Sequence, residues 1–75
     1  MRAYAKINAL VREGELRYEV LFQETYRHNF WRLGWFATEA SAVQAAVIRA
    51  GGSITVQANV YPHGTRKHGE IIEQR

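Results

Sequence analysis

Apolar and polar residues alternate over residues 2–12, and this period of two predicts a half-buried β-strand. A helix is the competing interpretation, because Ala3, Ile7 and Val11 also fit helical spacing and alanine favours helices. We favour the strand because the alternation persists through five successive inward positions. These positions are Ala3, Ala5, Ile7, Ala9 and Val11.

Two further strands are predicted to follow in antiparallel order. Residues 12–15 contain Gly14 and predict a turn into a strand over residues 16–26, with Leu16, Tyr18, Val20 and Phe22 on one face. The polar residues 27–29 predict a second turn, and residues 30–37 a third strand. Aromatic side chains occupy both faces of this strand, so the pattern leaves open which set is buried. One set is Trp31, Leu33, Trp35 and Ala37, and the other is Phe30, Arg32, Gly34 and Phe36.

A helix is predicted over residues 39–50, between an N-cap at Thr38 and the helix stop Gly51-Gly52. Its apolar stripe has small side chains, which suit close packing against the alanines of the first strand. Alternation over residues 54–61 predicts a fourth strand, which Pro62 ends. The tail over residues 70–75 contains Ile71-Ile72 and suggests a short fifth strand. The stripe consists of Ala40, Val43, Ala46, Val47 and Ala50.

The predicted element order is therefore β-β-β-α-β in one domain over residues 1–75. We expect an α+β fold of two layers, with one helix on a mostly antiparallel sheet of four strands, or five with the tail. A single helix can cover one face of such a sheet. The other face is expected to stay open.

Composition narrows the chemistry. The 75 residues include no cysteine and no aspartate, which excludes disulfides, thiolate metal sites and aspartate-based triads. The beginning of the chain lacks the apolar region of a signal peptide, and no apolar run approaches a membrane span. We expect a cytoplasmic protein that contacts no membrane. The net charge of +3 is compatible with nucleic acid without requiring it.

Catalytic and metal sites are not expected. Ser41 and Ser53 lie in no recognisable nucleophile motif, and His63 and His68 have no carboxylate between them. The glutamates at positions 13, 15, 19 and 24 are interpreted as surface charges. We therefore predict no enzyme activity, no cofactor and no bound metal.

Basic and aromatic side chains interleave on the face expected to be open, and this mixture suits a binding surface. Packing of these rings without any partner is the competing interpretation. A larger protein or ribonucleoprotein is the favoured partner, nucleic acid the second, and a second copy of the chain, paired into a homodimer at a free sheet edge, the third. The candidate residues are Tyr4, Lys6, Arg17, Leu21, Phe30, Arg32 and Phe36, joined by Thr55, Gln57, Asn59 and Tyr61, with Arg27, His28, Arg66 and Lys67 in the loops.

In size and element order, with the helix over residues 38–52 running directly into a strand, the chain resembles small proteins of phages and mobile elements. Among these it is similar to anti-CRISPR proteins that lay one helix across an antiparallel sheet. The resemblance implies stoichiometric binding to a large ribonucleoprotein effector, with inhibition by blocking DNA entry or recruiting a nuclease. It assigns no functional residue.

Overall fold

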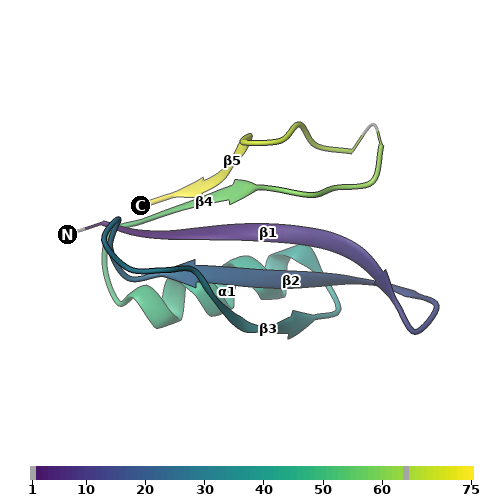
Figure 1. Cartoon of the computed structure of the whole chain (residues 1–75), viewed down its shortest axis with the longest axis horizontal. Helices are drawn as coiled ribbons and strands as arrows, with labels where there is room; N and C mark the ends of the chain where they lie inside the picture. The colour runs from purple at the N-terminus through teal and green to yellow at the C-terminus, as the bar shows by residue number, and fades with distance from the viewer. Residues whose placement is uncertain (1, 64) are drawn as a thin grey trace.

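The computed structural model describes residues 2–63 and 65–75, which form five strands and one helix (Figure 1). The strands lie in the order β3-β2-β1-β4-β5, and every neighbouring pair is antiparallel except β1 with β4. The predicted α+β class is confirmed, and the tail does form the fifth strand. Gly64, in the predicted basic loop, and Met1 lie outside the described residues. The elements are β1 (Ala3–Arg12), β2 (Glu15–Gln23), β3 (Trp31–Phe36), α1 (Glu39–Ala50), β4 (Ile54–Ala58) and β5 (Ile71–Gln74).

The helix determines the order of the strands. β1 and β2 form a hairpin whose turn residues, Glu13 and Gly14, have φ angles of 53° and 80°. β3 then adds to the outer edge of β2. α1 crosses the sheet from this edge and packs on β3, β2, β1 and β4. The crossover brings β4 to the far side of β1, where the two strands run parallel, and β5 completes the sheet.

Alanines line the contact between the central strand and the helix. Ala5 of β1 and both Ala42 and Ala46 of α1 are fully buried. Because these side chains end at Cβ, the helix axis can lie close to the sheet, and larger residues from β2 and β4 fill the flanks. The strand interpretation of residues 2–12 is confirmed. The core consists of Ala3, Ala5, Ile7, Val20, Phe22, Ala42, Ala46, Ile54 and Val56.

The predicted helix boundaries are also confirmed. The Thr38 hydroxyl accepts a hydrogen bond from the backbone N–H of Ser41 at 3.1 Å, as expected of an N-cap. Gly51 ends the helix with a φ of 64° and donates its N–H to the carbonyl of Val47. This left-handed conformation favours glycine.

The far end of the β1–β2 hairpin extends beyond the helix, which corrects two core assignments. Val11 and Leu16 pair across the hairpin, but their exposed fractions are 74% and 40%. A helix of twelve residues spans about 18 Å, whereas a ten-residue strand spans about 33 Å. The alternation therefore continues past the point where α1 can bury it (Figure 1).

A β-bulge decides the orientation of the third strand. Val20 pairs with Gly34 while the next residue, Leu21, pairs with Arg32, so Leu33 is an extra residue in β3. Trp31 and Phe36 are five residues apart, and an unbroken strand would place them on opposite faces. The bulge places both on the helix side.

The contacts of these rings bear this out. Trp31 meets Phe22 edge to face at 5.7 Å, and Phe36 packs against the core. A Cβ on Gly34 would lie 3.3 Å from the Phe36 ring, so glycine allows the ring to lie over the strand. Phe36 is therefore not on the open face, and Trp35 is. Each of the two predicted sets of side chains is divided by the bulge.

The packing predicts that added volume at Ala46 destabilises the fold. Ala46→Leu inserts three heavy atoms where the side chain has no exposed surface, and we expect a loss of about 1–3 kcal/mol in the free energy of unfolding. Urea denaturation followed by circular dichroism measures it. The matched control is Ala40→Leu, because Ala40 is exposed although the pattern predicted it in the apolar stripe, and we expect a change there below about 0.5 kcal/mol. Equal effects at both positions would contradict the close contact.

Candidate functional site

The candidate site is the sheet face opposite α1, here called the open face. Within the part of the chain that the structure describes, no helix packs on this face. The alternation in β1 assigns even-numbered residues to it, and the register of each pair carries the assignment to the neighbouring strands. Its members are Arg2, Tyr4, Lys6, Asn8, Leu10 and Arg12, then Glu15, Arg17, Glu19, Leu21 and Gln23, then Arg32 and Trp35, then Thr55 and Gln57, and at the β5 edge Ile71 and Gln74.

Positive charge is concentrated on this face. It carries five arginine or lysine side chains and two glutamates, a balance of +3. The other five cations and five glutamates of the sequence lie on the helix side, in the loops or in the tail, and they cancel. The formal net charge of the whole chain therefore resides on the open face. The five cations are Arg2, Lys6, Arg12, Arg17 and Arg32.

Trp35 is the centre of a cluster at the β3 side of this face. The guanidinium carbon of Arg12 lies 4.7 Å from the centroid of the Trp35 ring, and that of Arg32 lies 5.5 Å from it. Both distances are within the range of cation–π attraction. We call Arg12, Arg32 and Trp35 the Trp35 cluster. Of these three residues, the sequence predicted only Arg32 as a binding residue. The face of Trp35 depends on the bulge, which has no signal in the alternation pattern.

A second ring–cation pair lies toward the other end of the face. The Lys6 ammonium lies 4.5 Å from the centroid of the Phe30 ring, just before β3 begins. Arg17 makes an ion pair with Glu15 on the same strand, and Tyr4 lies beside Gln23 and Thr55. The structure thus brings together on one surface the predicted residues Tyr4, Lys6, Arg17, Phe30 and Arg32.

A buried polar network crosses the middle of the open face. Asn8 donates to Glu19 at 2.9 Å and accepts from the side chain of Asn59 and the backbone N–H of Val60. Glu19 in turn accepts from Arg32 Nε at 2.9 Å. Glu19 is only 8% exposed, so its interpretation as a surface charge is wrong. Long neighbouring side chains cover it, and the network fixes the direction of Arg32.

Tyr61 and Arg66 lie elsewhere, which corrects their predicted positions. Tyr61 packs against the core on the helix side, with its ring 6.3 Å from that of Tyr18. Its hydroxyl donates to Glu39 at 2.7 Å, and Arg66 binds both oxygens of the same carboxylate at 2.7 and 2.6 Å. Arg66 also pairs with Glu70. Arg66 is thus committed to fastening the β4–β5 loop to the start of α1.

This arrangement shifts the titration of its members. The hydrogen bonds from Arg66 hold the pKa of Glu39 below its ordinary value of 4.5, partial burial opposes that shift, and the Tyr61 hydroxyl adds to it. Burial, followed by the hydrogen bond to Glu39, raises the pKa of Tyr61. The hydrogen bond to Glu39 raises the pKa of Arg66. The ion pair is therefore intact at neutral pH.

The remaining candidate residues in the loops do not lie on the open face. Arg27 and His28 are exposed in the β2–β3 turn, where Arg27 stacks on Tyr26 and His28 lies 4.0 Å from Glu24. Lys67 is exposed in the β4–β5 loop. These three side chains occupy chain segments outside the strands that form the open face.

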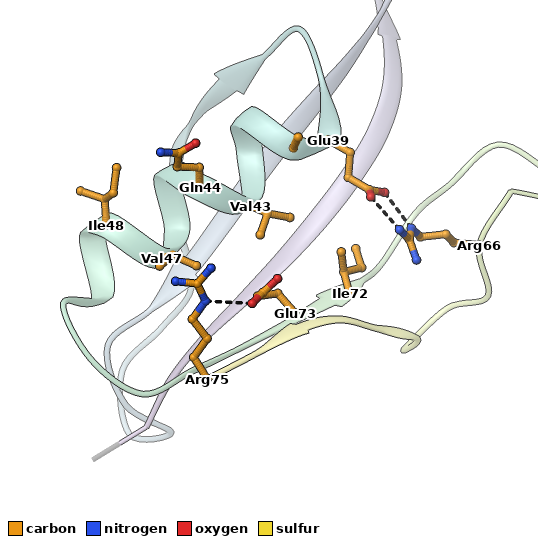
Figure 2. A pocket seen from close by; sticks show the side chains of 10 residues that line it. Glu39, Val43, Gln44, Val47, Ile48, Arg66, Ile72, Glu73 and Arg75 are labelled. Carbon is orange, nitrogen blue, oxygen red and sulfur yellow. Dashed lines mark hydrogen bonds and ion pairs between the residues drawn. The ribbon is translucent and has the colours of Figure 1, made fainter.

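A groove lies between α1 and β5, away from the open face (Figure 2). This groove has a volume of about 630 Å³, and Val43, Val47 and Ile72 form its apolar floor. The ion pairs Glu39–Arg66 and Glu73–Arg75 border it. Its charges are paired with one another, whereas the open face has cations in excess.

No group of three metal-ligating side chains gathers among residues 2–63 and 65–75. The helix that the structure describes is too short and too polar to cross a membrane. Comparison with known proteins found no matching family model, no matching curated protein and no matching solved structure. The candidate site is therefore argued from its own chemistry.

Asn8 is predicted to be important for the stability of the open face. Asn8→Ala removes a donor to the buried Glu19 carboxylate and leaves the Val60 N–H without its acceptor. We expect the free energy of unfolding to fall by about 1–3 kcal/mol, measured by urea denaturation. Gln57→Ala, a truncation on the same face, is the control, with an expected change below about 0.5 kcal/mol. A stable Asn8→Ala variant would show that the network does not hold the face together.

The Glu39–Arg66 pair predicts a specific response to acid. Because the folded-state pKa of Glu39 is lowered, its contribution is present above the unfolded pKa and disappears as the pH falls through the folded pKa. We expect Glu39→Gln to lower the free energy of unfolding by up to about 1 kcal/mol at pH 7. Below about pH 4.5, we expect the stability of this variant to fall less steeply with pH than that of the unchanged protein. Thermal denaturation across this range measures both effects. Glu13→Gln, in the β1–β2 turn, controls for the removal of one carboxylate, and an equal response there would contradict the assignment.

Proposed function

We propose that this protein is a non-enzymatic binding module whose open face docks on a negatively charged surface of a larger protein or nucleoprotein. The observation that supports the proposal is that the net charge of +3 lies on this one face, while the rest of the molecule is balanced. A localised excess of one sign steers and orients an oppositely charged partner.

The state of the cations on this face supports docking. Lys6 and Arg12 make no ion pair to any residue that the structure describes. Each lies over an aromatic ring instead, Lys6 over Phe30 and Arg12 over Trp35. By contrast, Arg49, Arg66 and Arg75 on the remainder of the molecule each have a glutamate partner. On the open face itself, Arg17 and Arg32 are paired with Glu15 and Glu19. A partner that supplies anions would therefore meet Lys6 and Arg12 as the unpaired cations of this face among the described residues.

The antiparallel-rich sheet also gives this surface rigidity. β1 and β2 pair through nine residue positions, and the Asn8–Glu19–Arg32 network links them to β3. Pre-ordered side chains lose little conformational entropy when a partner binds. Inhibition of a defence ribonucleoprotein, as the architectural resemblance implies, is one use of such a surface, and docking through the open face does not require it.

The location of charge predicts the outcome of a matched pair of triple variants. One removes three cations from the open face, as Lys6→Gln, Arg12→Gln and Arg17→Gln. The other removes three from elsewhere, as Arg27→Gln, Lys67→Gln and Arg75→Gln. Both bring the formal net charge from +3 to zero. We expect the open-face variant to elute from immobilised heparin at clearly lower salt than the second variant, because the heparin sulfates contact this face.

Binding measured across salt concentrations gives the same comparison quantitatively. Each contact with an anionic group of a polyanion adds to the slope of log affinity against log salt, by about 0.9 for a phosphate of duplex DNA. We therefore expect the slope of the open-face variant to be clearly shallower than that of the second variant. Circular dichroism confirms that both variants are folded. Equal elution of the two variants, or a greater loss in the second, would reject the open face as the docking surface.

A further inference from the structure

The Trp35 cluster combines two kinds of contact at one point of the open face. The guanidinium groups of Arg12 and Arg32 both lie over or beside the same indole ring, at 4.7 and 5.5 Å from its centroid. A planar guanidinium can hold a phosphate by its terminal nitrogens and can stack on a flat ring. Both arginines can therefore reach one phosphate placed next to the ring.

The network beneath the cluster leaves Arg32 ready for such a ligand. Glu19 accepts a hydrogen bond from Nε of Arg32, and this contact is an ion pair of 2.9 Å. The two terminal nitrogens of Arg32 have no hydrogen bond to any residue in the described ranges, and the side chain is 58% exposed. Glu19 thus acts as a positioning residue that directs the free edge of the guanidinium to the solvent.

The indole of Trp35 has an unused hydrogen-bond donor. Trp35 Nε1 is the buried side-chain nitrogen for which the described residues supply no acceptor. A buried donor without a partner is unfavourable, and it is rare in folded proteins. The other tryptophan differs, since Trp31 Nε1 donates to Glu24 at 3.2 Å. A ligand atom that accepts a hydrogen bond from Trp35 Nε1 would satisfy this donor.

The composition of the open face favours nucleic acid over an acidic protein. The centre of a protein–protein interface is usually apolar and depleted of charge. Here the centre is the polar pair Asn8 and Glu19. The exposed aliphatic side chains Val11, Leu16 and Ile48 lie off the face, and Ile71, the partner of Gln57, lies at its β5 edge rather than at its centre. Cations beside aromatic rings, in a polar surround, match the surfaces that bind single strands by phosphate contacts and base stacking.

We infer that the Trp35 cluster binds single-stranded nucleic acid, with Arg12 and Arg32 on a phosphate and the Trp35 ring against a base. This inference rests on the proposed function, because it requires the open face to be the docking surface. It adds the chemical class of the partner. Lys6 and Phe30 offer a second ring–cation pair for the same strand.

Fluorescence anisotropy with a labelled single-stranded DNA of twelve mixed nucleotides tests the inference. We expect Trp35→Leu to weaken binding of this strand by about tenfold or more, because a base–ring stack is lost. Trp31→Leu removes the tryptophan on the helix side of β3. We expect the affinity of this variant for the DNA to lie within about twofold of that of the unchanged protein. Polyglutamate with twelve carboxylates is the second probe, and Trp35→Leu should leave its binding unchanged.

A direct measurement avoids dependence on the stability of Trp35→Leu. The chain has two tryptophans, so Trp31→Phe leaves Trp35 as the sole indole. Stacking of a base on the ring should quench its fluorescence when the DNA is added, and polyglutamate should not quench it. Glu19→Gln, which removes the charge that positions Arg32, should weaken binding of the DNA more than binding of polyglutamate.

Three results would overturn the inference while leaving docking through the open face intact. In the first, Trp35→Leu lowers the affinity for the DNA and for polyglutamate by the same factor. In the second, the DNA binds saturably without quenching the fluorescence of Trp35. In the third, polyglutamate binds more tightly than the DNA. The last result would identify an acidic protein as the partner. If the triple open-face variant and its control bind heparin alike, the proposed function itself fails.

Discussion

The fold of this protein depends on the close packing of small side chains between β1 and α1. Ala5 and Ala46 have no exposed surface, and their size lets one helix seal the middle of a five-stranded sheet. The crossover that carries this helix also sets β4 parallel to β1. A chain of 75 residues has little apolar volume for its core, so the absence of gaps along this contact is needed for stability.

The same contact explains why the two faces of the sheet differ. The odd-numbered side chains of β1 from Ala3 to Ala9 are buried on the helix side, whereas the even-numbered ones, apart from the buried Asn8, are at least partly exposed on the open face. A sheet face that no second layer covers is in contact with water. Here charged side chains and a polar network occupy the centre of that face. Asn8 and Glu19 are buried among polar partners, so they order this surface without requiring a second layer. Arg12 and Lys6 then remain available for an anionic partner.

The bulge at Leu33 connects the fold to the candidate chemistry. Without it, Trp31 and Phe36 would point to opposite sides of the sheet, and Arg32 and Trp35 would do the same. With it, Phe36 packs against the core and Trp31 against Phe22, and an arginine and a tryptophan meet on the open face. The groove between α1 and β5 contrasts with this surface, since its glutamates and arginines neutralise one another.

Local patterns were enough to predict much of this protein. Alternation predicts β1, β2 and β4, and Thr38 and Gly51 delimit the helix, because each signal depends on neighbours within a few residues. Tyr4, Lys6 and Arg17 could be placed on one face for the same reason, whereas the pattern left open which face of the third strand carries Phe30 and Arg32. The ends of two strands were predicted too late, since β2 ends at Gln23 rather than at residue 26 and β4 at Ala58 rather than at residue 61. Long-range contacts decided the rest. The bulge places Trp35 rather than Phe36 on the open face. Tyr61 and Arg66 lie on the helix side, where both bind the Glu39 carboxylate. The 12-residue helix is too short to cover Val11 and Leu16. None of these outcomes has a local signal, because each depends on a partner distant in the chain or on the finite length of another element.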